Sequence, residues 1–570
     1  NNLAQVTDIE GGVEGFSVAP SGDRILYIKR VPVVKRSSSE LYSDLGQSKA
    51  KIYDDLMERH WDYWDDGSYL HLFVADMAGR VTGGTDIMEG EPWDAPLAPY
   101  FDASEIAWNH AGTQLAYTCK KLTGTQYALS TDSDIYLYDV ASGRTSNLTE
   151  GMPGYDKYPV FSPDDSMIAF TSMERPGNES DKDRLFVMSL ADGSKRYLTE
   201  GFDYNAGNVR WADDSTLLFL SPIRATIQLC SVSLSGGPVR VITSGAHDLN
   251  AFSAAGGRVV AEMTTLGSPT ELFDVNPSDG AMTRITNTNA EIYERIRMGK
   301  VEERWVETTD GKRMLVWVVL PPDFDPSKKY PALLYCQGGP QSVVSQFWSY
   351  RWNLQLMAAQ GYVVVAPNRR GLPSFGQEWL DQISGDYSGQ NIRDYLSAID
   401  DVSAEPWVDR DRLGCVGASY GGYSVFFLAG NHQKRFKAFI AHCGMFNFES
   451  MYGATEELWF PNNDLGGPYW SDSPVARRSY ANSPHKFVKN WDTPILIFSG
   501  QRDFRIPYTE SLQAFTAARL MGVPSRLVSF EDEAHQVFKP QNSLVWNREF
   551  FSWLDRYVKN AETPAEQTGR

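Results

Sequence analysis

The 570-residue sequence has no apolar run long enough to cross a membrane as a helix, so insertion into a membrane is not expected. Basic residues are also outnumbered, since the sequence has 53 Lys and Arg but 72 Asp and Glu, which gives a formal net charge of −19. Phosphate binding requires a basic surface, so this balance argues against nucleic acid and anionic membranes as partners. An acidic surface suits a cationic partner, such as the free amino terminus of a peptide, although general solubility explains most of the charge.

Cysteine is rare and does not form a recognisable framework. The five cysteines are odd in number, none forms Cys-x-x-Cys, and Cys336 and Cys415 lie in apolar stretches. They are expected to be buried thiols and not disulfides or zinc ligands, and no metal or other cofactor is expected. The opening residues lack the charged-then-apolar pattern of a signal peptide, so they do not indicate the cellular compartment of the protein.

What the sequence does contain is a repeat over residues 1–290. A turn of small residues precedes an apolar strand, and an alternating hairpin with a tight glycine turn follows. The turns recur at about the length of one four-stranded blade, at Gly143, Gly193, Gly237 and Gly280. This spacing predicts a β-propeller domain over 1–290, with a regular β-sandwich as the alternative. Five units are recognisable, and residues 3–7 resemble the last strand of another, so the chain is expected to begin part-way through the propeller.

Two insertions interrupt the repeat. Residues 31–67 are polar and are predicted to be rather helical, and residues 86–101 include Glu91 and Trp93. Both insertions mix aromatic residues with carboxylates. Such loops can cap the ends of blades, and they can also bind an ammonium group through ion pairing and cation–π contact. The sequence leaves both interpretations open.

Residues 291–570 change to apolar strands that alternate with amphipathic helices, which predicts a mostly parallel sheet covered on both faces. The expected strands are residues 314–320, 331–335, 362–366, 413–416, 438–441, 494–498 and 525–530. The expected helices are residues 347–360, 391–402, 423–429, 509–521 and 541–558.

A candidate nucleophile lies at the end of the fourth of these strands. Gly417, Ser419 and Gly421 form Gly-x-Ser-x-Gly between a strand and a helix, which is the pattern of a nucleophile elbow on an α/β-hydrolase sheet. The glycines are required there because a side chain would collide across so sharp a turn. An ordinary strand-to-helix turn is the alternative, since the pattern also arises by chance.

The partners of such a serine should follow later strands, in the order acid and then histidine. Asp503 follows the strand over 494–498, and His535 follows the last strand. His535 would take the proton of Ser419 and later protonate the leaving amine, while Asp503 would orient the imidazole. Three other histidines compete for the role. His485 precedes the acid and is therefore in the wrong order, and His432 and His442 are expected to be structural.

Fixed N–H donors are needed to stabilise the oxyanion that forms during attack. The backbone N–H of Tyr420, directly after the nucleophile, is expected to be one donor. The second is expected from the glycine-containing loop over 336–340, either from the backbone of Gly338 or from Gln337.

A propeller followed by a hydrolase with Gly-x-Ser-Tyr-Gly-Gly resembles the prolyl oligopeptidase family of serine peptidases over essentially the whole chain. Several stretches resemble the bacterial dipeptidyl peptidases of that family most closely. They are residues 335–341, 366–371, 385–387 and 464–468, with 173–175 in the propeller and 455–459 after the nucleophile helix.

The resemblance implies a serine exopeptidase that releases dipeptides from the free N-terminus of oligopeptides, with small or hydrophobic residues preferred at the second position. It implies that a propeller carboxylate holds the substrate amine, with Glu91 and Glu174 as candidates, although either could instead hold blades together. Trp93 is placed with them, and Trp459 and Ile506, together with the Tyr420 ring, are candidates for the wall of the side-chain pocket. Ala454 stands near the position of a ring-stacking tyrosine in proline-cutting relatives, which implies a roomier, less proline-selective pocket.

Alternatives remain open. An acylaminoacyl peptidase or an oligopeptidase would share the whole architecture, and a catalytically silent peptide-binding propeller protein is a remote third alternative. A periplasmic or secreted location is implied by the resemblance alone. A homodimer is a candidate assembly that the sequence does not decide.

Overall fold

The computed structural model describes residues 4–560. The chain divides into two compact units, which are described separately. Unit 1 comprises the residues up to 220 together with 229–241 and 254–257, and unit 2 comprises 221–228, 242–253 and the residues from 258 onward.

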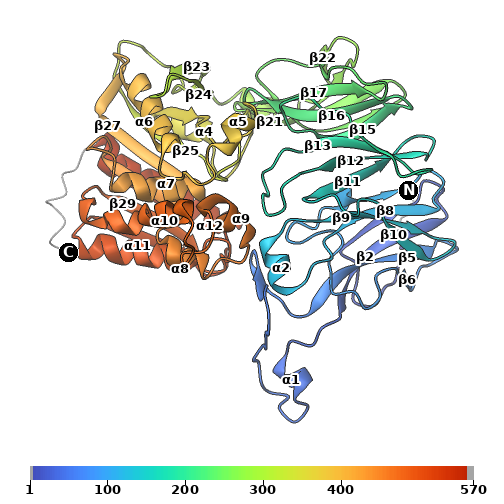
Figure 1. Cartoon of the computed structure of the whole chain (residues 1–570). Coiled ribbons are helices and arrows are strands. Elements are labelled where there is room, and N and C mark those ends of the chain that lie inside the picture. The colour runs from blue at the N-terminus through green and yellow to red at the C-terminus, as the bar shows by residue number, and fades with distance from the viewer. Residues whose placement is uncertain (1–3, 561–570) are drawn as a thin grey trace. The chain divides into compact units, whose positions relative to one another are not determined.

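Antiparallel four-stranded sheets follow one another through the first half of the chain (Figure 1). The first contains β1 (Gly15–Val18), β2 (Arg24–Pro32), β5 (Ser68–Asp76) and β6 (Thr85–Asp86). The second contains β7 (Ile106–Trp108), β8 (Gln114–Cys119), β9 (Asp134–Asp139) and β10 (Arg144–Asn147), and the third contains β11 (Asp156–Phe161), β12 (Met167–Ser172), β13 (Arg184–Ser189) and β14 (Lys195–Tyr197).

Two more sets of four strands continue the pattern. They are β15 (Gly207–Asp213), β16 (Thr216–Ile223), β17 (Thr226–Ser233) and β18 (Arg240–Val241), then β19 (Asp248–Ala255), β20 (Arg258–Thr265), β21 (Ser268–Val275) and β22 (Met282–Arg284). A single parallel bridge, Ile227 to Asp248, connects the two sets. Within residues 4–560 these five sets match the five predicted units, and the β-propeller prediction is confirmed.

The predicted glycine turns join the last two strands of four of these sets. All four glycines have the positive φ that such turns favour: Gly143 (66°), Gly193 (71°), Gly237 (105°) and Gly280 (77°). At the start of the chain, Thr7 forms an isolated bridge with Val81. Leu3, with which the predicted opening strand began, lies outside the described residues.

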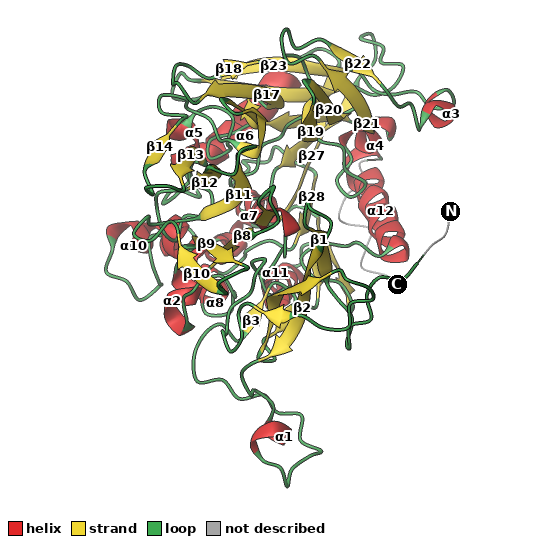
Figure 2. Ribbon diagram, turned by 90° about the vertical axis from the view of Figure 1, so that its right-hand side faces the viewer, coloured by secondary structure: helices red, strands yellow, loops and turns green. Residues whose placement is uncertain are grey.

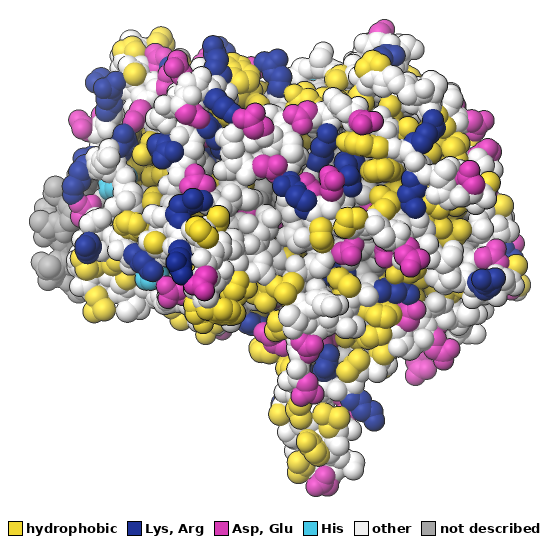
Figure 3. Space-filling view, viewed as in Figure 1, with side chains coloured by type: hydrophobic (Ala, Val, Ile, Leu, Met, Phe, Trp, Pro, Cys, Tyr) yellow, Lys and Arg dark blue, Asp and Glu magenta, His cyan; other side chains and the backbone are white. Residues whose placement is uncertain are grey.

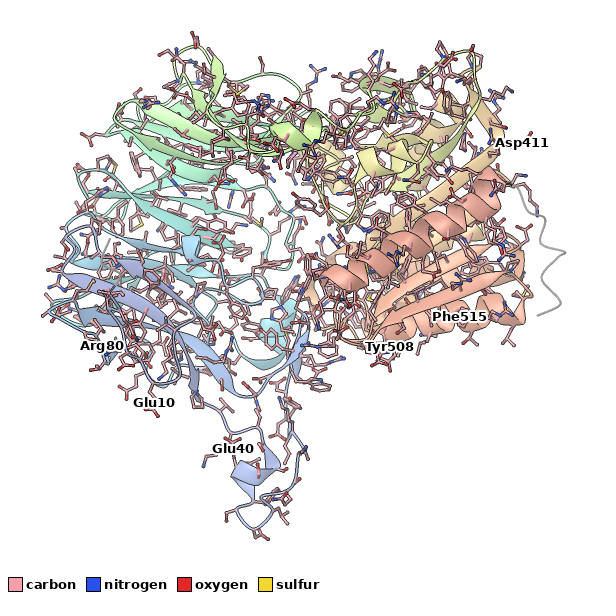
Figure 4. All side chains as sticks on the ribbon, turned by 180° about the vertical axis from the view of Figure 1, so that it is seen from behind. Glu10, Glu40, Arg80, Asp411, Tyr508 and Phe515 are labelled. Carbon is pink, nitrogen blue, oxygen red and sulfur yellow. The ribbon has the colours of Figure 1, made fainter. Side chains whose placement is uncertain are left out.

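The first insertion is not helical as predicted. Its only helix is the single turn α1 (Ser38–Leu41), and it also contains a two-stranded ribbon of β3 (Arg59–His60) and β4 (Tyr63–Trp64). Ser37 caps α1 through a capping box with Glu40, the residue labelled in Figure 4. Side chains then hold the rest as a loop, since Arg36 pairs with Asp65 at 3.0 Å. The short elements η1 (Ala103–Glu105) and α2 (Gly124–Leu129) complete this part of the chain.

The second half contains an eight-stranded sheet in the order β23-β24-β26-β25-β27-β28-β29-β30. Its strands are β23 (Val301–Glu307), β24 (Arg313–Val319), β25 (Tyr330–Cys336), β26 (Val363–Pro367), β27 (Val408–Ala418), β28 (Ala438–His442), β29 (Ile495–Gly500) and β30 (Ser525–Phe530). In this order the neighbouring strands from β26 to β30 pair parallel, whereas β24 pairs antiparallel with both β23 and β26. Within this eight-stranded sheet, the edge strand β23 is the one strand that the sequence pattern did not predict.

Helices pack on this sheet (Figure 2). Those in contact with its strands are α4 (Leu354–Ala359), α6 (Gln390–Ser403), α7 (Tyr420–Ala429), α11 (Tyr508–Leu520) and α12 (Pro540–Leu554), which continues as a π-helical turn over Asp555–Lys559. Shorter helices are α3 (Ala290–Tyr293), α5 (Gln377–Asp381), α8 (Phe448–Tyr452), α9 (Trp459–Leu465), α10 (Pro474–Ala481) and η2 (Pro484–Asn490). The core of unit 2 lies between sheet and helices, where Trp352 packs against Trp546 with ring centroids 5.0 Å apart.

The helix predicted over 347–360 is shorter than expected. The Ser349 hydroxyl accepts hydrogen bonds from the backbone N–H groups of Arg351 and Trp352, and Asn353 caps the helix at Leu356. These local bonds replace helical ones, so α4 begins only at Leu354.

We propose a domain boundary at 290/291, because the four-stranded pattern ends at Arg284 and the hydrolase sheet begins at Val301.

Candidate active site

Ser419 sits in a strained elbow between β27 and α7. Its φ is 59° and its ψ −122°, and its backbone N–H donates to the His442 carbonyl at 2.9 Å. The predicted collisions are real, because a Cβ on Gly417 would lie 2.6 Å from the Gly421 carbonyl oxygen, and one on Gly421 would overlap the Cys336 carbonyl. Glycine at both positions therefore lets the backbone close tightly enough to present the Ser419 hydroxyl at the strand end.

The structure brings the three predicted catalytic residues together within unit 2. His535 Nε2 lies 2.9 Å from Ser419 Oγ, and His535 Nδ1 lies 2.7 Å from Asp503 Oδ2. Asp503 follows β29 and His535 follows β30, as expected for residues at the carboxyl edge of a parallel sheet. The other carboxylate oxygen of Asp503 accepts a hydrogen bond from the Ile506 backbone N–H at 2.8 Å, which fixes the carboxylate.

The environment of His535 favours its charged form. Burial lowers the pKa of this imidazole, but the adjacent Asp503 carboxylate and the Cys443 thiol together outweigh burial, so the pKa lies above its ordinary value. The buried thiol of Cys443 also approaches, with Sγ 3.9 Å from Nε2. Cys443, Asp503 and His535 have the spacing of metal ligands, but the carboxylate and the imidazole are already bonded to each other.

The competing histidines have other contacts. His442 Nδ1 lies 3.3 Å from the Trp546 indole nitrogen, and burial lowers its pKa. His432 Nδ1 accepts from the Phe436 backbone N–H at 3.1 Å. The Nδ1 atom of His485 lies 2.8 Å from a serine hydroxyl, Ser483 Oγ. These contacts support the structural roles expected for His432 and His442, and they give His485 a partner outside the group of Ser419, Asp503 and His535.

The loop over 336–340 lies beside the nucleophile. A Cβ on Gly338 would be 3.5 Å from the Ser419 Cβ, so the Gly338 backbone is close to the reacting hydroxyl. The Gln337 side chain has other partners, since its Oε1 accepts from the Tyr335 hydroxyl at 2.6 Å and its Nε2 donates to Ser342 Oγ at 3.2 Å. Of the two sequence candidates, the geometry favours the Gly338 backbone over the Gln337 side chain as an oxyanion donor.

The predicted pocket residues of unit 2 are largely buried. Trp459, at the start of α9, is 7% exposed, and Ile506 is 3% exposed. The Tyr420 ring, which was also considered as a pocket wall, is buried with its hydroxyl donating to Asn391 Oδ1 at 2.7 Å. The Tyr420 side chain is thus anchored away from solvent, and its backbone N–H is the part that remains as a site candidate.

Of the predicted residues of unit 1, Glu91 and Trp93 share a contact with Lys121, whereas Glu174 has a different partner. Glu91 pairs with Lys121 at 2.7 Å, and Lys121 also lies 5.4 Å from the Trp93 ring centroid. The Trp93 indole N–H donates to the Leu122 carbonyl at 2.7 Å. Glu174 is largely exposed and pairs with Arg184 at 3.4 Å. Both glutamates therefore already contact a cation.

Unit 1 contains a cavity of about 300 Å³ that both insertions line. Its lining includes Arg36 and Asp65 from the first insertion and Trp93 and Asp94 from the second, whereas Glu91 and Glu174 are not in it. Asp94 Oδ1 accepts from the Leu70 backbone N–H at 2.7 Å, and burial raises the Asp94 pKa to about 6. Asp94 was not among the residues predicted for the site, although the Trp-Asp pair in an aromatic, acidic loop is the signal for it.

Comparison with known proteins agrees with this architecture. Residues 348–561 match the model of the prolyl oligopeptidase family. Dipeptidyl-peptidase 5 of Porphyromonas gingivalis is 52% identical over 552 residues, covering 96% of this chain and 80% of the relative. Dipeptidyl-peptidase 5 of Porphyromonas endodontalis is 47% identical, covering 97% and 80%.

Solved structures share the fold at low identity. Pyrococcus horikoshii acylaminoacyl peptidase has a TM-score of 0.79 at 21% identity, over 97% of this chain and 82% of that one. Porphyromonas gingivalis dipeptidyl peptidase 4 has a TM-score of 0.64 at 16% identity, over 95% and 74%. No helix among the described residues is both long and apolar enough to cross a membrane. The chain has a propeller and a hydrolase sheet, and a relative is 52% identical to it over 96% of its residues, so the chain belongs to the prolyl oligopeptidase family.

Proposed function

We propose that the protein is a serine exopeptidase that releases dipeptides from the free N-terminus of oligopeptides. The observation that carries the proposal is the chain of contacts from Ser419 through His535 to Asp503, at 2.9 and 2.7 Å. The names of the two Porphyromonas relatives support the dipeptide-releasing activity. By the resemblance, small or hydrophobic residues are preferred at the second position.

The contacts of these three residues support the following chemical steps. His535 Nε2 takes the proton of Ser419 Oγ as that oxygen attacks the carbonyl carbon, and the carbonyl oxygen becomes an oxyanion. The backbone N–H groups of Tyr420 and Gly338 stabilise this charge. His535 then gives its proton to the leaving amine and the acyl-enzyme remains. Water, deprotonated by His535, attacks the ester, the bond to Ser419 Oγ breaks, and the serine regains its proton while the dipeptide leaves.

Exopeptidase action requires a group that binds the substrate amine. Glu91 and Glu174 remain candidates, and each would have to exchange its present cation for the amine. We add Asp94, since it and Trp93 line the cavity of unit 1 and a carboxylate beside an aromatic ring suits an ammonium group. Trp459 and Ile506 are proposed for the apolar pocket that receives the second residue.

The proposed setting follows from the same resemblance. The substrate is an oligopeptide, and the location is the periplasm or the outside of the cell. A homodimer is the proposed candidate assembly. Acidic and basic side chains are interspersed over the face in Figure 3, which suits neither nucleic acid nor an anionic membrane.

The test is the product pattern from a free-amine oligopeptide of defined sequence. The wild-type enzyme should release the N-terminal dipeptide first and then successive dipeptides, as followed by mass spectrometry. S419A should release none while retaining the wild-type unfolding temperature. Release of single residues, internal cleavage as the first event, or equal activity in S419A would contradict the proposal.

A further inference from the structure

Arg369 is a fully buried arginine directly behind the loop that carries Gly338. It follows β26, is 0% exposed, and its Nη2 lies 3.4 Å from the Gln337 carbonyl oxygen. Its guanidinium carbon also lies 4.5 Å from the centroid of the Tyr420 ring. We propose that Arg369 is a positioning residue for both oxyanion donors, because it holds and polarises the Gln337–Gly338 peptide and fixes Tyr420. The inference rests on the proposed peptidase activity.

The first contact acts through one peptide unit. The Gln337–Gly338 bond is trans, so its C=O and N–H point in opposite directions. The C=O accepts from Arg369 Nη2 and from the Tyr395 hydroxyl, each at 3.4 Å, and Tyr395 in turn accepts from Arg369 Nε at 3.0 Å. The N–H of Gly338 must therefore point away from these donors. Because a hydrogen bond to the C=O polarises the whole amide, a cationic donor there strengthens the N–H as a donor.

The second contact fixes the residue that follows the nucleophile. The Tyr420 hydroxyl donates to Asn391 at 2.7 Å, and the Arg369 guanidinium lies over the Tyr420 ring. The ring is held at its tip and over its face, so the backbone of Tyr420 at the start of α7 has little freedom. Preorganised donors of this kind do not have to reorient when charge develops, which is the main source of oxyanion stabilisation.

The charge of Arg369 lacks a carboxylate partner. Among residues 4–560 no Asp or Glu lies within ion-pair distance of it, whereas its neighbour Arg370 pairs with both Asp310 and Asp394. Its remaining donor, Nη1, bonds to the Arg370 carbonyl at 2.7 Å. A buried, uncompensated cation is costly for folding, so a gain elsewhere is expected. The oxyanion beside Gly338 would supply the missing negative charge only while the reaction proceeds.

The test compares R369M, which keeps the length and loses the charge, with R369K, which restores the charge, and Y395F, which removes one donor to the Gln337 carbonyl. R435M is the matched control, because Arg435 pairs with Asp400 away from the site and Arg435 is partly exposed. Each variant is assayed with a free-amine dipeptidyl amide. Affinity is measured for a dipeptide boronic acid, which bonds to Ser419 as a tetrahedral anion, and for the product dipeptide.

R369M should lower kcat by about tenfold to a hundredfold, somewhat less than loss of a direct donor, with KM changed less than about threefold. Boronate affinity should fall by a similar factor while product affinity stays constant. R369K should recover part of both losses, Y395F should show a smaller loss of the same kind, and R435M should match wild type.

An unchanged kcat and boronate affinity in folded R369M would overturn the inference. It would also be overturned if product and boronate affinities fell together, which would indicate a distorted site. If R369M does not fold, R369K and Y395F decide, and wild-type behaviour in both would refute the role. Failure of the wild-type enzyme to cleave the amide or bind the boronate would instead refute the proposed peptidase activity.

Discussion

At the scale of single residues, the elbow at Ser419 depends on the absence of side chains. A methyl group on Gly421 would overlap the carbonyl oxygen at the end of β25, a backbone atom that cannot move alone. The conformation of the nucleophile, with φ of 59°, is therefore maintained by the packing of its neighbours.

Replacing Gly421 with alanine should abolish peptidase activity and destabilise unit 2 by about 1–3 kcal/mol, because a core position becomes overpacked. Thermal unfolding and dipeptidyl amide hydrolysis measure the two effects. G83A is the control, because a Cβ on Gly83 has no atom within 4 Å and its φ is not positive. An active G421A enzyme with wild-type stability would contradict the steric account.

The pair of His535 and Asp503 sets the pH dependence. His535 must be neutral to accept the serine proton, and Asp503 raises its pKa, so kcat/KM should rise with pH through a value above about 6.5. D503N removes the negative charge, so it should shift this rise to lower pH and reduce kcat by about 10⁴-fold. D532N, in the loop that carries His535 but paired with Lys539, should do neither. A rise that stayed at the same pH in D503N would refute the assigned partnership.

The strand pattern together with the Gly-x-Ser-x-Gly motif predicted the three residues that the structure brings together at this site. Ser419, Asp503 and His535 were found because each follows a recognisable apolar strand, and strand ends meet at one edge of a parallel sheet. The choice between Gln337 and Gly338 could not be made, since it depends on the hydrogen bond from Tyr335 to the Gln337 side chain. That bond joins residues whose orientation no local pattern encodes.

At the scale of elements, the short segment η1 between two blades carries a buried ionisable group. Glu105 ends η1 and is 3% exposed, and its Oε2 accepts from the Leu97 backbone N–H at 2.7 Å. Burial raises the Glu105 pKa to about 8, from 4.5. The protonated form is thus favoured in the folded state, and the carboxylate is penalised.

The sign of this linkage predicts a pH effect on stability. The contribution of protonated Glu105 is complete below about pH 4.5 and is lost as the pH rises to about 8, by on the order of a few kcal/mol. E105Q keeps the acceptor and cannot ionise, so its unfolding temperature should exceed wild type at pH 9 and match it at pH 5. E150Q, at an exposed position, is the control for the change of charge. Parallel pH curves for wild type and E105Q would refute the prediction.

Elements differ in how well a pattern encodes them. The helices α6 and α11 were predicted within one residue at each end. Of the two, α6 is strongly amphipathic, so a repeating apolar signal explains its prediction, whereas α11 has no such one-sided pattern; Tyr508 and Phe515 lie on α11 in Figure 4. The first insertion was wrongly predicted to be rather helical. Its polar side chains bond to one another and to the backbone, as Tyr53 does to the Asp65 carbonyl, and these tertiary contacts replace the helix.

At the scale of the whole molecule, the two halves of the chain differ in how much of their function the sequence predicts. The chemistry of the hydrolase half follows from a few residues with fixed roles. The repeat predicted the propeller, but a repeating pattern does not indicate which carboxylate binds the amine of a substrate. The ion pairs of Glu91 with Lys121 and of Glu174 with Arg184 depend on the three-dimensional arrangement of the strands, so the sequence could not predict them. Selection for a free amino terminus is therefore the claim that most needs a direct test.

The decisive measurement compares kcat/KM for a free-amine dipeptidyl amide, such as Gly-Phe or Lys-Ala joined to a chromophore, with that for its acetyl-blocked counterpart. A dipeptidyl peptidase should prefer the free amine by about tenfold or more, which is about 1.4 kcal/mol of transition-state binding. Equal or faster cleavage of the blocked substrate would contradict the proposed function and favour an acylaminoacyl peptidase or an oligopeptidase. Cleavage of neither substrate would favour a peptide-binding protein without catalysis.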